Sequence, residues 1–151
     1  MKNASKPKNK WIVVADSQKA RLLVGRLTEH GRPHLEEKGS LETNYLPSER
    51  ERSSSQQGGI HHGHVDSSHE GEERVSHFAR QLSGWLQGQV QQNQIQDCLV
   101  FAPARFLGAL RKELPSALQQ RVAERHGEMT KMGIGDLAQH PGIAAELKAL
   151  V

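Results

Sequence analysis

The chain has 151 residues, a length typical of one domain that buries its own core. Hydrophobic residues make up 35% of the chain and aromatic residues only 4%, and the formal net charge is +3. A single cysteine excludes an intramolecular disulfide, and no apolar stretch approaches the length of a membrane span. We therefore expect a cytoplasmic protein without membrane insertion, whose mild basic excess is compatible with a nucleic-acid or ribosomal partner.

The first ten residues carry four lysines and no acidic residue. The apolar run that follows, residues 11–15, is too short for the hydrophobic region of a signal peptide. Residues 1–10 are predicted as a disordered basic arm, and residues 11–151 as one folded domain. The arm is either a solvated tail or a segment that contacts RNA or a membrane surface.

Three strands are predicted before the middle of the chain. Residues 11–15 form an apolar, β-branched run, and residues 20–27 form a second apolar run after a polar turn. Residues 34–41 make a weaker third strand after a turn that contains Gly31. Because both connections are short, the three strands should form an antiparallel meander.

Helices and strands alternate in the second half. Apolar residues from Val75 to Val90 recur at steps of three and four, which predicts an amphipathic helix capped by Ser67 or Ser68. The remaining predicted elements are a buried strand at 98–102, a helix at 105–114, an edge strand at 120–125 and helices at 134–139 and 143–150. This order predicts a single α/β domain with a mixed sheet. The strands before and after the long helix should lie parallel and central.

Three motifs resemble the bacterial host attachment proteins. Residues 14–22, VADSQKARL, resemble the ADxxxARL opening of that family, and residues 78–82, FARQL, resemble its FAxxL helix. Residues 100–111, VFAPARFLGALR, resemble its most specific signature, VxAPPRFLGxLR. Order and spacing are kept from about residue 11 to the C-terminus. The family name refers to bacterial adhesion, which implies a protein partner in an adhesion or stress pathway as one alternative.

That family is similar, more distantly, to the middle domain of archaeal and eukaryotic class I peptide-chain release factors. The similarity implies a ribonuclease-H-like topology of order βββ-loop-αβαβα and a ribosome or tRNA partner. In those factors a Gly-Gly-Gln loop helps water attack the peptidyl-tRNA ester. Here Gly58 and Gly59 take the corresponding place, and Ile60 stands where the glutamine would be. Since isoleucine cannot position water, the resemblance implies a translation-related factor without release chemistry.

A polar tract, residues 42–72, separates the meander from the long helix and is predicted to be a flexible loop. It has too few large apolar residues to offset the entropy of its own ordering, and such insertions are usually functional loops or linkers. Its tentative metal ligands are His62, His64, Asp66 and His69. These residues have three interpretations. They belong to a solvated loop that binds zinc adventitiously, they form the metal site of a metal-dependent hydrolase, or they form a pH-responsive histidine cluster. No resident cofactor is expected.

Basic residues outside the arm form the second candidate site. Together with Gly58 and Gly59, the tentative RNA- or partner-binding residues are Arg50, Arg52, Arg105, Arg111 and Lys112. They would contact phosphates, or they are scattered solubilising charges among neighbouring glutamates. Without an aromatic platform for base stacking, any RNA binding should be backbone-driven and steeply salt-dependent.

Two further residues have ordinary structural interpretations that outweigh the catalytic ones. Asp16 follows the first strand and is expected to bond the backbone of its own turn rather than to hold a metal. Cys98 begins an apolar run and is expected to be a core residue rather than a nucleophile.

Overall fold

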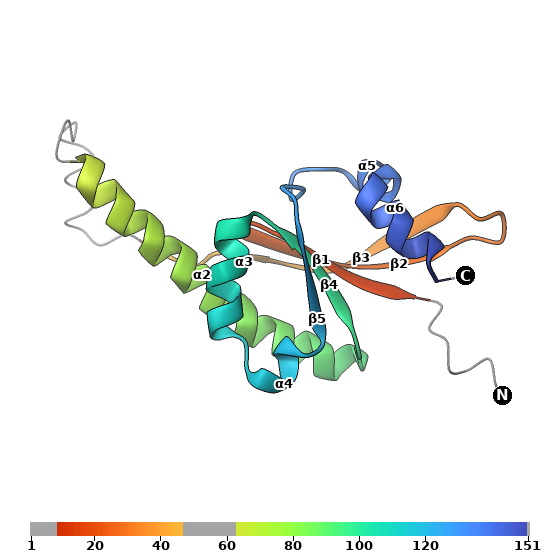
Figure 1. Cartoon of the computed structure of the whole chain (residues 1–151), viewed down its shortest axis with the longest axis horizontal. Helices are drawn as coiled ribbons and strands as arrows, with labels where there is room; N and C mark the ends of the chain where they lie inside the picture. The colour runs from red at the N-terminus through yellow and green to blue at the C-terminus, as the bar shows by residue number, and fades with distance from the viewer. Residues whose placement is uncertain (1–8, 47–62, 151) are drawn as a thin grey trace.

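The computed structural model describes residues 9–46 and 63–150, with side chains from residue 71 onward in the second range. Five strands form one mixed sheet (Figure 1). The strands are β1 (Lys10–Ala15), β2 (Lys19–Leu27), β3 (Pro33–Glu42), β4 (Cys98–Ala102) and β5 (Val122–His126). The order across the sheet is β3-β2-β1-β4-β5. Strands β1 to β3 pair antiparallel, whereas β4 is parallel to both β1 and β5.

Helices cover both faces of this sheet. They are α2 (Gly63–Asn93), α3 (Ala104–Glu113), α4 (Ser116–Gln119), α5 (Ile134–Gln139) and α6 (Pro141–Lys148). Helices α2 and α3 pack on the face that carries Val13, Leu22 and Val100, and α5 and α6 on the face that carries Ile12, Leu23 and Leu99. The predicted α/β fold with a mixed sheet is therefore confirmed, and only the short α4 was not predicted. None of the helices in the described residues combines the length and apolar character needed to cross a membrane.

The arrangement of two strands corrects the sequence prediction. Strand β3, which precedes the long helix, lies at an edge of the sheet and not in its centre. A tight hairpin from β2 fixes it there, and most of its residues are exposed. Strand β4, which follows the long helix, lies inside the sheet between β1 and β5: all five of its residues are buried, and it pairs with β1 rather than β3. The helices on the two faces of the sheet bury its apolar side chains, and β1 and β5 pair with its two edges.

Helix α2 begins earlier than its apolar periodicity indicated. It starts at Gly63, so Ser67 and Ser68 lie inside the helix and do not cap it. Its 31 residues correspond to a length of about 46 Å, and its N-terminal end projects past the sheet (Figure 1). Residues 63–72 lack an apolar stripe, so hydrophobic periodicity does not detect them. Once the packed part of a helix exists, each added residue gains a backbone hydrogen bond, which favours its extension.

The core under α2 and α3 is built around two aromatic rings. The centroids of Phe78 on α2 and Phe106 on α3 lie 5.8 Å apart, and both side chains are buried. Cys98 is buried in the same cluster, and its burial raises the pKa of the thiol to about 12. The thiol is therefore neutral at any physiological pH, and the prediction that Cys98 is a core residue is confirmed.

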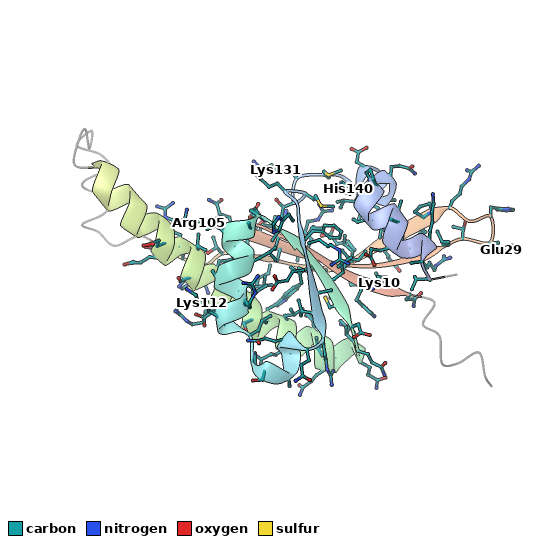
Figure 2. All side chains as sticks on the ribbon, viewed as in Figure 1. Lys10, Glu29, Arg105, Lys112, Lys131 and His140 are labelled. Carbon is teal, nitrogen blue, oxygen red and sulfur yellow. The ribbon has the colours of Figure 1, made fainter. Side chains whose placement is uncertain are left out.

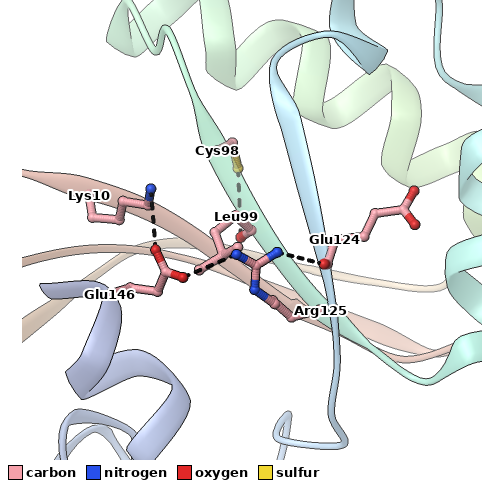
Figure 3. Close-up of polar contacts among 6 residues, drawn as sticks. All are labelled: Lys10, Cys98, Leu99, Glu124, Arg125 and Glu146. Carbon is pink, nitrogen blue, oxygen red and sulfur yellow. Dashed lines mark hydrogen bonds and ion pairs between the residues drawn. The ribbon is translucent and has the colours of Figure 1, made fainter. Parts of the chain in front are cut away.

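Polar contacts hold chain segments against the sheet and its helices on both sides. After β3, the backbone amide of Asn44 donates to Gln81 Oε1 at 3.0 Å, and Gln81 Nε2 donates to the Glu42 carbonyl at 3.0 Å. These two hydrogen bonds hold the end of β3 against α2. On the other side of the sheet, Glu146 on α6 pairs with Lys10 of β1 at 3.6 Å and with Arg125 of β5 at 3.2 Å (Figure 3).

Two glycines provide a test of this packing. A Cβ added at Gly84 on α2 would meet nothing within 4 Å. Gly84→Ala should therefore raise the free energy of unfolding by about 0.5–1 kcal/mol, because alanine is the better helix former. Gly25→Ala is the control. The new Cβ would lie 2.7 Å from Leu35 Cδ2 and 2.9 Å from Leu147 Cδ2, both on buried side chains, so this substitution should destabilise the fold. Urea denaturation measures both; a loss of stability in Gly84→Ala would contradict the exposed position of Gly84.

Candidate functional site

Helix α3 presents a basic outer face because its other face is buried. Phe106, Leu107 and Leu110 point into the core, which leaves Arg105 and Lys112 exposed on the solvent side. Pro103 precedes the helix and supplies no side-chain cap to its first turn. Arg105 and Lys112 are seven residues apart, so two helical turns, about 10.5 Å, separate their positions along the axis.

Helices α2 and α3 enclose a hollow of about 680 Å³, here called the α2–α3 hollow. Its small residues, Gly108 and Ala109, leave room between the two helices, and cationic side chains lie around them. The lining residues are Glu72, Val75 and Ser76 from α2 and Arg105, Gly108, Ala109, Arg111 and Lys112 from α3. The three basic residues that the sequence assigned to α3 therefore line one hollow.

A second hollow, of about 350 Å³, lies at the carboxyl ends of β1 and β4 and is here called the end hollow. In open α/β sheets, ligands bind outside the carboxyl ends of the strands. The end hollow is lined by Asp16, Ser17, Gln18, Val75, Pro103, Arg105, Phe106, Glu128 and Lys131. Because both hollows include Val75 and Arg105, they form one surface, the edge surface. A third hollow of about 620 Å³ continues this surface past Lys131 to Glu42 and Thr43.

The cations of the edge surface differ in how far their charge is compensated. Arg111 donates from Nε to Glu124 of β5 at 3.0 Å, and this hydrogen bond raises the pKa of the guanidinium. Within the described part of the chain, by contrast, Arg105, Lys112 and Lys131 make no ion pair. Figure 2 shows Arg105 and Lys112 along α3 and Lys131 beyond the start of α3, whereas Lys10 and Glu29 lie toward the other end of the sheet. Three cations that form no ion pair with any described residue thus line the edge surface.

The remaining candidates from the sequence are not brought into this site by anything the structure describes. Arg50, Arg52, Gly58, Gly59 and His62 lie outside the described residues. His64, Asp66 and His69 lie on α2 in a stretch whose side chains are not described. Zinc binding by the histidines therefore stays a prediction. Among the residues with described side chains, no group of three His, Cys, Asp or Glu is placed to hold a metal ion.

Asp16 bonds to its own turn, as expected. Its Oδ1 accepts hydrogen bonds from the amides of Gln18 and Lys19, both at 2.8 Å. Its Oδ2 accepts from Thr130 Oγ1 at 2.6 Å. Both carboxylate oxygens are thus engaged by the protein, and Asp16 acts as a structural clamp between β1 and the segment that follows β5.

Arg21 is the buried charge that completes this clamp. Its guanidinium donates from Nη1 to the carbonyls of Thr130, at 3.0 Å, and Met132, at 2.6 Å. Nε and Nη2 donate to Glu37 Oε1 at 3.1 and 2.8 Å. Arg21 and Asp16 together hold residues 129–132 against the sheet, and Lys131 lies between the two residues whose carbonyls Arg21 binds. Sequence reasoning did not identify Lys131 or Glu128, because nothing in their local sequence indicates that β1 and β2 hold this segment.

Removing the guanidinium of Arg21 should loosen the segment that carries Lys131. Arg21→Met should lower the free energy of unfolding by about 2–4 kcal/mol, because two carbonyls and a carboxylate lose their donor. Glu37→Gln is the matched control. The Glu37 side chain is 34% exposed, so removing its negative charge should lower the free energy of unfolding by less than about 1 kcal/mol. Chemical denaturation gives both values, and hydrogen exchange at residues 129–132 should accelerate only in Arg21→Met. Equal costs for the two variants would contradict this role of Arg21.

Comparison with known proteins tests the resemblance to release factors. The family model described as bacterial archaeo-eukaryotic release factor family 12 matches residues 9–140. That range includes every strand, helices α2 to α5 and the whole edge surface. No curated protein matches the chain. The resemblance to release factors is thereby confirmed, and the chain belongs to the bacterial archaeo-eukaryotic release factor family 12.

Proposed function

We propose that this protein is a non-enzymatic, cytoplasmic translation factor that binds ribosomal RNA or tRNA through the edge surface. The observation that carries the proposal is a set of exposed cations, Arg105, Lys112 and Lys131, that form no ion pair with a described residue. They lie around hollows between α2, α3 and the carboxyl ends of the strands. Family membership supports a translation-related role. A protein partner in an adhesion or stress pathway is the alternative that the host attachment resemblance leaves, and no feature of the described surface favours it.

The chemistry of the surface favours contact with the nucleic-acid backbone. Arginine and lysine bind phosphates without reading sequence, and each such contact releases counterions from the nucleic acid. The phenylalanines Phe78, Phe101 and Phe106 are all buried, and the partly buried rings of Trp11 and Trp85 pack against the core. The ring of Tyr45 is in contact with His77 and Arg74, and none of the described residues that line the α2–α3 hollow is aromatic. Binding should therefore be strongly salt-dependent and weakly selective for sequence.

The proposal extends to a ribonuclease-H-like topology of the release-factor middle-domain type. It is supported by the meander β1–β3, the long helix α2 and the return of the chain to a strand parallel to β1. Gly58 and Gly59 precede α2 in the sequence, at the place of the Gly-Gly-Gln loop of release factors. Because Ile60 has no polar side-chain atom, the proposed factor binds the ribosome or tRNA without promoting peptide release.

Neutralising two of the cations should reduce both the affinity for RNA and its dependence on salt. For a single strand, log K falls with log salt with a slope of about −0.7 per phosphate contact. The Arg105→Ala/Lys112→Ala variant should therefore show a slope shallower by about 1.4 than that of the wild type. Fluorescence anisotropy of a labelled single-stranded RNA over a range of salt concentrations measures the slope. Co-sedimentation with ribosomes at low and high salt should show the same loss.

The matched control is Arg26→Ala/Lys148→Ala, which removes the same charge from the other end of the sheet. Arg26 follows Gly25, which pairs with Lys10 at the beginning of β1, and Lys148 lies two residues after Glu146, which binds Lys10. Both side chains are exposed. If the two double variants lose affinity equally, binding is due to net charge and the edge surface is not the site. A wild type that neither binds RNA nor sediments with ribosomes would favour the protein-partner alternative.

The loss of release chemistry has its own test. Wild-type protein added to ribosomes that carry peptidyl-tRNA should leave the rate of ester hydrolysis unchanged, because Ile60 cannot orient water. Scintillation counting of released labelled peptide measures that rate. Hydrolysis accelerated by the wild type, and abolished by deleting residues 58–60, would overturn this part of the proposal.

A further inference from the structure

The end hollow has the size and position of a small-ligand site. Its volume of about 350 Å³ is at the lower end of the range for pockets that enclose small molecules. Residues far apart in the sequence build it: Ser17 follows β1, Pro103 follows β4, Val75 belongs to α2, and Lys131 lies between β5 and α5. Its shape thus depends on the tertiary fold, and Asp16 and Arg21 hold the most distant of these segments in place.

Three kinds of surface meet in the end hollow. Arg105 and Lys131 provide two cations from different elements. Val75 and Pro103, both half-buried, provide an apolar wall backed by the buried ring of Phe106. Glu128, which is exposed, provides a carboxylate acceptor. A phosphate, an aromatic base and a sugar hydroxyl are the groups that such surfaces bind.

The acidic residues of the end hollow indicate which kind of ligand it binds, a small anion or a larger molecule that carries an anionic group. Asp16 and Glu128 balance the formal charge of Arg105 and Lys131, so a free phosphate ion would meet as much repulsion as attraction. Asp16 already accepts three hydrogen bonds from the protein, whereas the exposed Glu128 accepts none from a described residue, so Glu128 is the more available acceptor for a ligand. A ligand that combines an anionic group with hydroxyl donors uses both charges of the site. A ribonucleotide has this combination, and its 2′-hydroxyl distinguishes RNA from DNA.

We infer that the end hollow holds one unstacked nucleotide of an RNA strand, with its phosphate between Arg105 and Lys131 and a ribose hydroxyl donating to Glu128. The inference rests on the proposed function, because the rest of the strand lies along the α2–α3 hollow. Arg105 lines both hollows, so a strand that contacts Lys112 and then Arg105 passes directly to the end hollow. The protein would therefore prefer RNA to DNA of the same sequence.

The test compares single-stranded oligonucleotides that differ only in the sugar, an oligouridylate and its deoxy counterpart, by fluorescence anisotropy. Lys131→Ala should weaken RNA binding about fivefold at low salt and make the salt slope shallower by about 0.7. Glu128→Ala should strengthen DNA binding, because a repulsive charge is removed, and should bring the preference for RNA over DNA close to one. A role in electrostatics alone would strengthen RNA and DNA binding in the same proportion and leave the preference intact, which would overturn the inference.

Two controls separate this inference from the proposed function. Lys148→Ala and Glu29→Ala remove single exposed charges outside the edge surface and should leave affinity and preference unchanged. If Lys131→Ala behaves like Lys148→Ala while Arg105→Ala/Lys112→Ala loses affinity, the end hollow is not a nucleotide site and the proposed function stands. If the wild type binds neither RNA nor ribosomes, both fail. Circular dichroism and thermal unfolding of each variant establish that it folds as the wild type does.

Discussion

The buried guanidinium of Arg21 is the contact on which the functional end of the molecule depends. A charge with so little access to water is stable only when its donors are used, and here they bind two backbone carbonyls and one carboxylate. The carbonyls belong to a segment more than 100 residues away along the chain. Asp16 binds the same segment through Thr130. The ADxxxARL motif is thus explained as a clamp that fixes where the chain passes after β5.

The hydrogen bonds of Asp16 and Arg21 hold the segment after β5 at the edge of the sheet where the functional surface lies. Helices α2 and α3 cover one face and α5 and α6 the other, and each pair encloses its own apolar cluster. The segment with Lys131 crosses the edge between these faces, where the carboxyl ends of β1 and β4 open into the end hollow. Arg111 and Glu124 hold the far end of α3 on β5, so Arg111 serves the fold although it lines the α2–α3 hollow. Structural and functional cations are therefore distinguished by their partners and not by their position in the sequence.

Local sequence patterns predicted most of the secondary structure, because each apolar run has the period of the element that it forms. Strands β1, β2 and β4 and helix α3 are short segments in which burial alone decides the pattern. The start of α2 was missed because its first turns lack an apolar stripe. The position of β3 at an edge was missed because pairing depends on which strand offers a free side, which composition does not show.

Among the candidate site residues, the sequence by itself identified the basic face of α3, since Arg105, Arg111 and Lys112 occupy the positions that the buried side of the helix leaves to solvent. It also determined the core role of Cys98 and the turn role of Asp16, which depend on nearest neighbours in the chain. Only the tertiary structure decided that Arg111 is paired with Glu124, and that Lys131 and Glu128 line one hollow with Arg105. The physical reason is that both arrangements depend on contacts between separate elements. Arg111 binds a glutamate of strand β5, and hydrogen bonds across more than 100 residues hold the segment of Glu128 and Lys131, so no local pattern records either arrangement.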